Sequence, residues 1–136
     1  MASIFTKIIS GEIPSYKVAE SNDYFAFLDI KPLAMGHTLV VPKKEVDYIF
    51  DMSDGELSGL ISFAKKVADI LKSEVDCARI GLSVIGLEVP HTHIHLIPIQ
   101  SVSDMNFSAE RAVFTNEEYE TLCNRLKISF QKKYGL

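Results

Sequence analysis

Cysteines are few in this sequence of 136 residues, and long apolar runs are missing. The two cysteines, Cys77 and Cys123, lie far apart with no paired spacing, so we expect free thiols and no disulfide framework. No apolar run approaches the length of a membrane span. The apolar opening stretch 1–17 is broken by Lys7 and Pro14, which argues against a secretory signal peptide. We therefore expect a cytoplasmic protein with no membrane partner.

An excess of basic residues is also missing. The net charge is −4 and no basic stripe stands out, which argues against binding to nucleic acid backbones. Internal repeats, low-complexity tracts and Pro/Gly-rich linkers are missing as well, so we predict a single domain over residues 1–136. The 47% apolar and 24% charged residues are typical of a chain that folds around a core.

The first third of the sequence predicts a short helix and three strands. Residues 4–10 suit one or two helical turns, ended by the glycine and proline that follow. Segments 16–21 and 24–30 read as strands joined by the turn residues 21-SND-23, and 37–42 reads as a third strand.

A long amphipathic helix is predicted to begin after Ser53. Ser53 as N-cap with Glu56 at the third helical position forms a capping-box pattern. Apolar residues then recur at steps of three and four, which predicts about five helical turns that can cover a small sheet. These residues are Leu57, Leu60, Ile61, Ala64, Val67, Ala68 and Leu71.

The second half of the sequence predicts two more strands and a last helix. The strands are residues 79–84 and 89–98, whereas 99–114 shows no readable pattern. Thr115 and Glu118 form a second capping pattern, and the helix after them has one apolar side. That side comprises Tyr119, Leu122, Cys123, Leu126 and Phe130. Strands joined by short connections, with one helix among them, predict an α+β fold with a mostly antiparallel sheet.

The stretch 91-HTHIHLIP-98 contains three of the four histidines of the chain. Side chains of a strand alternate between faces, so His91, His93 and His95 would project from one side. Ile94 and Leu96 would project from the other side and pack on the long helix. Three imidazoles on one face of a strand, with apolar residues on the other face, indicate a functional site rather than histidines with a purely structural role.

Two kinds of chemistry fit such a trio. One metal ion cannot bind both end histidines of an extended strand, because their Cα atoms would lie ~13 Å apart. A pair of them could bind a metal with a third ligand from elsewhere, such as His37. Acid–base or nucleophilic catalysis fits better, because crowded imidazoles cannot all be charged and a neutral ring can attack phosphorus or carbon. The spacing alone names no substrate.

The stretch 91–98 resembles the signature of the histidine-triad (HIT) family. The opening 4-IFTKIISGEIPSYKVAES-21 and the block 24-YFAFLDIKPLAMGHTLVVPKK-44 resemble that family in order and spacing, so the resemblance covers residues 4–98. It implies a five-stranded antiparallel sheet with one long helix and a C-terminal helix. It also implies homodimers whose two sheets join, with Leu60, Phe63 or Val67 facing the partner's helix.

The resemblance implies an enzyme that acts on a purine nucleotide or nucleotide conjugate. His93 would attack the α-phosphate, and water or another acceptor would resolve the nucleotidyl-histidine, as in the cleavage of an AMP-amine. His91 and His95 would contact the phosphate or orient the nucleophile, and His37 would belong to the supporting network. Asp29 would bind the ribose hydroxyls. The base would lie against Phe5, Ile8, Phe27, Leu28 and Ile30. No cofactor and no metal are expected.

Two departures from the family pattern matter for function. The stretch 83-SVIGLEVPH-91 lacks the longer Gly-rich loop, with its amide and hydroxyl residues, that relatives carry near the phosphate, and Glu88 stands where a hydroxyl is expected. Two alternatives therefore stay open: a nucleotide-binding regulatory module with little catalysis, and a dinucleoside polyphosphate hydrolase. Ser3 and Thr6 occupy the positions of zinc-binding cysteines in some bacterial relatives, so we expect no structural zinc.

Overall fold

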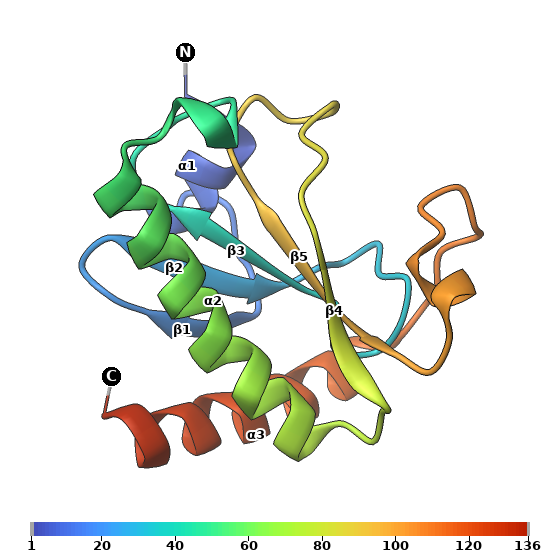
Figure 1. The fold of residues 1–136 in the computed structure, drawn as a ribbon. Coiled ribbons are helices and arrows are strands. Elements are labelled where there is room, and N and C mark those ends of the chain that lie inside the picture. Colours follow the sequence, from blue (N-terminus) through green and yellow to red (C-terminus); the bar gives the residue numbers. More distant parts are fainter. Residues whose placement is uncertain (1, 136) are drawn as a thin grey trace.

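A computed structural model describes residues 2–135. Met1 and Leu136, which the predicted domain 1–136 includes, lie outside the described residues. The chain forms one antiparallel sheet in the order β1-β2-β3-β5-β4 (Figure 1). Its strands are β1 (Lys17–Glu20), β2 (Tyr24–Leu28), β3 (Thr38–Pro42), β4 (Arg79–Ser83) and β5 (Ile94–Ile99). The predicted α+β fold with a five-stranded antiparallel sheet is thus confirmed.

Three α-helices accompany the sheet: α1 (Ile4–Ile9), α2 (Asp54–Glu74) and α3 (Asn116–Tyr134). Two short 3₁₀ helices lie at Ile49–Asp51 (η1) and Val102–Met105 (η2). Both long helices begin with the predicted capping boxes, in which the N-cap side chain and the glutamate at the third helical position satisfy each other's backbone N–H groups. All five predicted apolar residues of α3 are buried.

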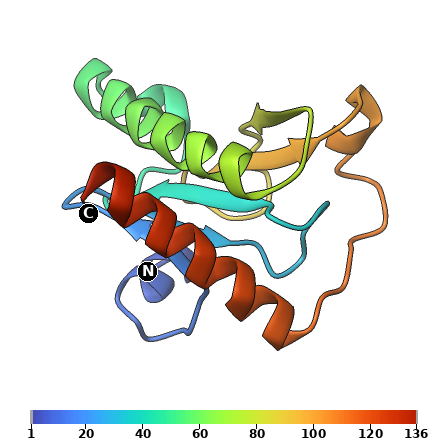
Figure 2. The ribbon, with the colours of Figure 1, turned by 90° about the horizontal axis from the view of Figure 1, so that it is seen from below.

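The helices divide the two faces of the sheet. Helices α2 and α3 pack on one face and against each other, whereas α1 lies on the opposite face (Figure 2). The main core lies between the sheet and the two long helices, and Ile94 and Leu96 belong to it as predicted. A smaller core beside α1 contains Phe5, Phe25, Phe27, Leu39 and Val41. The predicted site lies on the α1 face.

The buried side of α2 differs from the predicted stripe. Ile61 is 42% exposed, whereas Phe63 and Ile70 are buried. The helix packs both on the sheet and on α3, so its buried surface is turned toward α3 and away from Ile61. The expectation that Leu60, Phe63 or Val67 faces a partner's helix is wrong, because all three side chains lie in the core of their own chain.

The last strand is shorter than predicted. It begins at Ile94, and the chain from 84 to 93 is irregular. The ladder between β3 and β5 does not continue to the residues before Ile94. There the Pro42 carbonyl accepts a hydrogen bond from the His91 ring at 2.8 Å. A side chain therefore replaces the backbone partner that a continued ladder would supply.

Two further sequence predictions bear on the environment of the protein. Among residues 2–135, no helix has both the length and the apolar character needed to cross a membrane. Cys77 and Cys123 are both free and buried.

Candidate active site

Antiparallel pairing of β3 with β5 gathers the four histidines. His37 precedes β3, His95 lies in β5, and the register pairs Leu39 with His95. His91 and His93 lie in the extended segment just before β5. All four are buried, with 9% exposure or less. Every side-chain nitrogen and oxygen atom of the described residues that is closed off from solvent has a hydrogen-bond partner, and the partners of each ring indicate where its proton lies.

His93 is held with one nitrogen free. Its Nδ1 lies 2.8 Å from the backbone carbonyl oxygen of His91. A carbonyl oxygen only accepts hydrogen bonds, so Nδ1 carries the proton and Nε2 keeps its lone pair. Edges and faces of aromatic rings enclose His93: its ring centroid lies 4.9 Å from that of Phe5 and 5.0 Å from that of His95. This arrangement suits a neutral imidazole nucleophile.

His91 uses both ring nitrogens for structural contacts. Its Nε2–H donates to the Pro42 carbonyl at 2.8 Å, and its Nδ1 accepts the Ser3 hydroxyl proton at 2.6 Å. Burial lowers the pKa of His91, so the neutral ring that this pattern requires is favoured. The part of His91 that contacts His93 is its backbone carbonyl. Its predicted role in orienting the nucleophile is compatible with this geometry. The ring has no free nitrogen with which to contact a phosphate.

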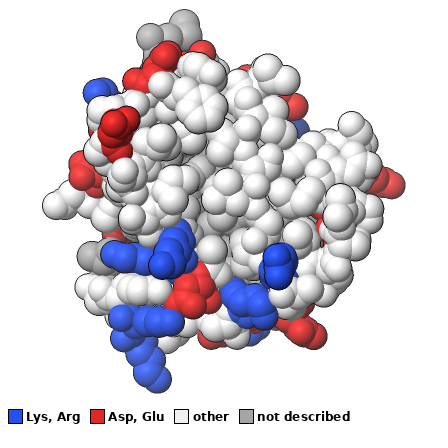
Figure 3. Space-filling view, in the orientation of Figure 1, with Lys and Arg blue, Asp and Glu red and all other residues white. Residues whose placement is uncertain are grey.

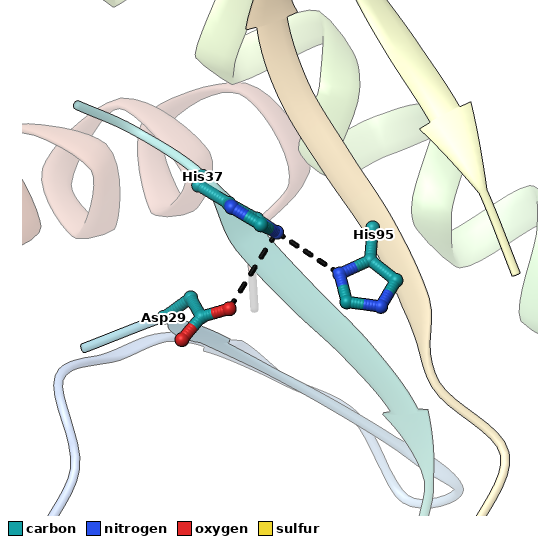
Figure 4. A group of neighbouring side chains, drawn as sticks. All are labelled: Asp29, His37 and His95. Carbon is teal, nitrogen blue, oxygen red and sulfur yellow. Dashed lines mark hydrogen bonds and ion pairs between the residues drawn. The ribbon is translucent and has the colours of Figure 1, made fainter. Parts of the chain in front are cut away.

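The hydrogen bonds of His37 and His95 place the protons on this pair. The backbone N–H of Leu33 donates to Nδ1 of His37 at 3.0 Å, so the proton of the neutral His37 ring must lie on Nε2. That Nε2–H donates to Nδ1 of His95 at 3.0 Å, which leaves the His95 proton on Nε2 (Figure 4). His95 therefore offers a hydrogen-bond donor to an oxygen of a substrate. The His37 ring is thus the hydrogen-bond donor to His95.

Burial keeps this pair neutral. It lowers the pKa of His37 to about 3 and that of His95 to about 4, and neighbouring positive charge acts in the same direction. Adding a proton to either ring would also place two N–H groups against each other in the series of hydrogen bonds that starts at the Leu33 N–H. Hydrogen bonding and burial thus favour the same protonation state.

Asp29 follows β2 and reaches the same place (Figure 4). Its Oδ1 accepts the backbone N–H of Lys31 at 2.9 Å, and its Oδ2 lies 3.6 Å from Nε2 of His37. Burial raises the pKa of this carboxyl, and the Lys31 N–H acts against that rise. The side chain is 17% exposed, so part of the carboxylate can contact a ligand.

Asp29, His37 and His95 also resemble a metal site, because one ligand atom from each lies within 4.8 Å of the others. A metal needs a lone pair on the ligating nitrogen, but the Leu33 N–H holds the proton of His37 on Nε2. The three side chains as they are hydrogen-bonded do not fit a metal ion. A cation at Nε2 of His37 would have to displace that proton, and the ring would then carry its proton on Nδ1, against the Leu33 N–H.

The apolar residues predicted to enclose a base do not all lie together. Phe5 and Phe27 are in contact in the small core, and Ile8 packs against it. Leu28 is directed to the opposite face, where it is 1% exposed in the main core. Ile30 is 70% exposed and lines a surface hollow of about 520 Å³ between the chain before β1 and α3.

A second hollow, of about 820 Å³, runs beside β1 and α3. None of its lining residues belongs to the predicted site. Its charged side chains include Lys17 and Lys43, which form ion pairs with Glu20, so the candidate site lies at the histidines and not in this groove.

Two residues beside the histidines were missed by the sequence analysis. The Phe107 ring lies against His95, with ring centroids 4.8 Å apart, and Arg111 donates hydrogen bonds to the carbonyls of Lys31 and Phe107. Both lie in the segment 99–114, which has no periodic pattern. The only signal in the sequence is an isolated aromatic residue in a polar loop.

Comparison with known proteins places the chain in a family. The family model described as HIT domain matches residues 10–102. The chain belongs to the HIT family. An uncharacterised HIT-like protein of Methanocaldococcus jannaschii is 44% identical over 99 residues, which are 70% of this chain and 77% of that protein. The adenosine 5′-monophosphoramidase HNT1 of Saccharomyces cerevisiae is 40% identical over 98 residues, 71% of this chain and 62% of that protein.

Solved structures agree with the HIT assignment. A HIT-like protein of Bartonella henselae, described as involved in cell-cycle regulation, superposes with a TM-score of 0.79 at 32% identity, over 93% of this chain and 95% of that one. A protein of Sulfolobus tokodaii, described as a hypothetical histidine triad nucleotide-binding protein, gives a TM-score of 0.80 at 28% identity, over 97% and 96% of the two chains. The HIT fold thus extends beyond the matched residues 10–102 into α3.

Proposed function

We propose that this HIT-domain protein cleaves a nucleotide conjugate, such as an AMP-amine, at the α-phosphate through an intermediate on His93. The observation that carries the proposal is the free Nε2 of His93, whose Nδ1–H is fixed by the His91 carbonyl, beside the Nε2–H of His95. The HNT1 phosphoramidases among the relatives support a nucleotide hydrolase of this kind.

The proposed reaction has two displacements at phosphorus. First, His93 Nε2 forms a bond to the α-phosphorus while the bond from phosphorus to the amine nitrogen breaks, and the amine leaves with the electron pair and takes up a proton. Then water forms a P–O bond as the Nε2–P bond breaks, and its lost proton balances the one taken by the amine. The His91 carbonyl stabilises the positive charge that develops on the His93 ring during the first step.

The other predicted residues have roles in the same proposal. The Nε2–H of His95 donates to a phosphate oxygen, and the Asp29 carboxylate accepts the ribose hydroxyls. Phe5, Phe27 and Ile8 form the apolar surface for a purine base, and Ile30 borders it. The packing of Leu28 in the main core assigns it a structural part instead.

Trapping of the intermediate tests the proposal. Rapid acid-free denaturation during turnover of an AMP-amine, followed by peptide mass spectrometry at neutral pH, should find an AMP adduct on His93, because the phosphorus–nitrogen bond is acid-labile. The His93→Ala protein should give no adduct. Turnover by His93→Ala at the wild-type rate would refute the mechanism.

A nucleotide-binding module is the second candidate function. It is favoured by the segment 84–90, where Glu88 is exposed and no serine, threonine, asparagine or glutamine is present to hold a phosphate. Isothermal titration with AMP, set beside a fluorogenic AMP-amine assay, separates the two: binding without turnover favours the module. A parallel screen of dinucleoside polyphosphates tests the remaining hydrolase alternative.

The proposal includes a homodimer built on the edge strand β4. An edge strand has unpaired backbone groups, and Leu82, Ile85 and Leu87 near it are 51%, 45% and 89% exposed. The face that carries β4 and α2 has a broad area without charged side chains (Figure 3). Pairing of two β4 strands about a twofold axis would join the sheets and cover this area.

The location and extent of the domain are also part of the proposal. Two free buried cysteines are compatible with the reducing conditions of the cytoplasm. We treat residues 1–136 as one unit, since a single main core connects the sheet with both long helices.

A further inference from the structure

The chain after β5 returns to the histidines. It passes through η2 and continues as an irregular segment beside the loop between β2 and β3 (Figures 1 and 2). Phe107 lies in this segment, and its ring meets two histidine rings almost at right angles. The centroid distances are 4.8 Å to His95, at 71°, and 6.3 Å to His37, at 82°.

Arg111 fastens this segment to the loop that precedes His37. Its guanidinium group donates to the Lys31 carbonyl at 3.1 Å and to the Phe107 carbonyl at 3.2 Å, and it lies 5.6 Å from the centre of the Phe107 ring. The backbone N–H of Ala112 adds a hydrogen bond to the Pro32 carbonyl at 2.9 Å. The same loop supplies Leu33, whose N–H sets the protons of the histidine pair.

An apolar cover has a chemical consequence at this position. Water can both donate and accept a hydrogen bond, so a water molecule beside Nδ1 of His95 could accept a proton from it as readily as donate one. The two tautomers of His95 would then be close in energy. Without water, the only partner of this Nδ1 is the Nε2–H of His37, and the bond is stronger in the low-dielectric surroundings.

We propose that Phe107, clasped by Arg111, is a positioning residue that excludes water from the His37–His95 pair and so keeps the His95 proton on Nε2. The kinetic consequence rests on the proposed function, in which this proton faces the phosphate. The effect on the His95 tautomer does not rest on the proposed function. A purely structural role for Phe107 predicts lower stability with no change in the tautomer.

The test combines histidine ¹⁵N NMR with kinetics on the full chain. In the wild type, long-range ¹H–¹⁵N spectra at pH 7.5 should show His95 with its proton on Nε2 alone. In Phe107→Ala a substantial fraction should carry the proton on Nδ1, and kcat for an AMP-amine should fall about tenfold, the effect of one hydrogen bond, with KM within twofold. Phe107→Leu, which keeps an apolar cover, should restore the wild-type tautomer.

Two more variants keep the test decisive. Arg111→Met removes the clasp together with a positive charge that lowers the pKa of both histidines, and both rings stay neutral at pH 7.5 without it. It should shift the His95 tautomer in the same direction, including in the event that Phe107→Ala does not fold. Val113→Ala alters a side chain of the same segment that is 92% exposed, and it should change nothing. An unshifted His95 tautomer in folded Phe107→Ala or Arg111→Met would overturn the inference. Absence of turnover in the wild type would instead count against the proposed function, since the NMR needs no substrate.

Discussion

The hydroxyl of Ser3 lies 2.6 Å from Nδ1 of His91, so the residue that starts α1 also satisfies a fully buried histidine. The same oxygen accepts the backbone N–H of Thr6 as N-cap of the helix. Glu45 completes the connection, because its Oε1 accepts the Ser3 N–H at 2.6 Å and the Thr6 hydroxyl at 2.7 Å. These bonds hold α1, and with it the Phe5 ring, against the histidines.

Replacing Ser3 by alanine should therefore destabilise the protein more than a surface substitution does. It removes the helix cap, about 1 kcal/mol, and leaves a buried ring nitrogen unpaired, about 1–3 kcal/mol. We expect the free energy of unfolding in urea to fall by about 2–4 kcal/mol. Ser3→Thr keeps the hydroxyl and should lose much less. Ser10→Ala, which changes an exposed serine at the other end of the same helix, is the matched control, and an equal effect there would contradict the role of Ser3.

The two histidines joined by the 2.8 Å contact should respond differently to removal. His93→Ala should lower turnover of an AMP-amine by at least about 10³-fold, as expected for loss of a nucleophile, with little effect on stability. His91→Ala should instead destabilise the fold, because it leaves the Ser3 hydroxyl and the Pro42 carbonyl without their partner. Thermal unfolding and steady-state kinetics on both variants measure this contrast. Equal effects of the two substitutions on turnover and on stability would show that the two rings have equivalent roles.

Asp29 is predicted to bind the ribose through its charge. Asp29→Asn keeps an oxygen that can accept the Lys31 N–H, but it lacks the carboxylate for the hydroxyls. Affinity for AMP should fall about tenfold or more, as for other charged hydrogen bonds, whereas affinity for 2′-deoxy-AMP should change less. Calorimetric titration of both nucleotides with both proteins gives a double-mutant cycle. Equal losses for the two nucleotides would place the ribose elsewhere.

Stability should decrease in mild acid because of the buried histidine pair. Burial lowers the pKa of His37 to about 3 and of His95 to about 4, from 6.5. Between pH 6.5 and 4 the unfolded chain binds protons that the folded chain does not. The free energy of unfolding therefore decreases as the pH is lowered through this range, by up to about 1.4 kcal/mol per pH unit for each histidine. Above pH 6.5 this loss is absent.

Urea denaturation at pH 7.5, 6 and 5 measures this dependence. His95→Gln removes one of the titrating rings, so its unfolding free energy should depend less steeply on pH than that of the wild type. The difference between the two proteins is the quantity to compare, because His91 titrates in the same sense and Asp29 in the opposite sense. Parallel pH profiles would show that His95 is not held neutral by the fold.

The proposed dimer depends on the exposed apolar residues of the edge strand β4 and the segment after it. Leu82→Lys places a charge on the exposed side of β4, a device that prevents edge-to-edge pairing in many sheets. We expect light scattering to report a dimer for the wild type and a monomer for this variant. Ile128→Lys, at a position of α3 that is 66% exposed, should leave the dimer intact. A wild-type monomer would refute the assembly.

Local chemistry made most of the fold predictable from the sequence. The two capping boxes depend on residues three apart, so Ser53 and Thr115 identified the helix starts correctly. The apolar side of α3 was also correct, and its five residues are buried where the helix packs on β1 and α2. The buried side of α2 was only partly correct, since the exposure of Ile61 depends on where α3 and the strands lie around that helix.

The site was less predictable, for a physical reason. The contact between His37 and His95 joins residues 58 apart, and no spacing in the sequence indicates that these two rings meet. The start of β5 was wrong because a histidine ring, not a strand, takes the Pro42 carbonyl. Phe107 and Arg111 reach the histidines through an irregular loop, and no spacing rule describes such an approach.

In β5 the isoleucine at 94 and the leucine at 96 enter the main core, and the histidine between them lies on the other face. An insertion or deletion of one residue within this strand would turn the core-facing side chains to the other face and the histidine into the core. An imidazole would then lie in the apolar core under α2, and an aliphatic side chain would take its place in the candidate site. Folding and chemistry share one register. We expect changes of length to be tolerated outside the strand, as in the irregular stretch 84–90.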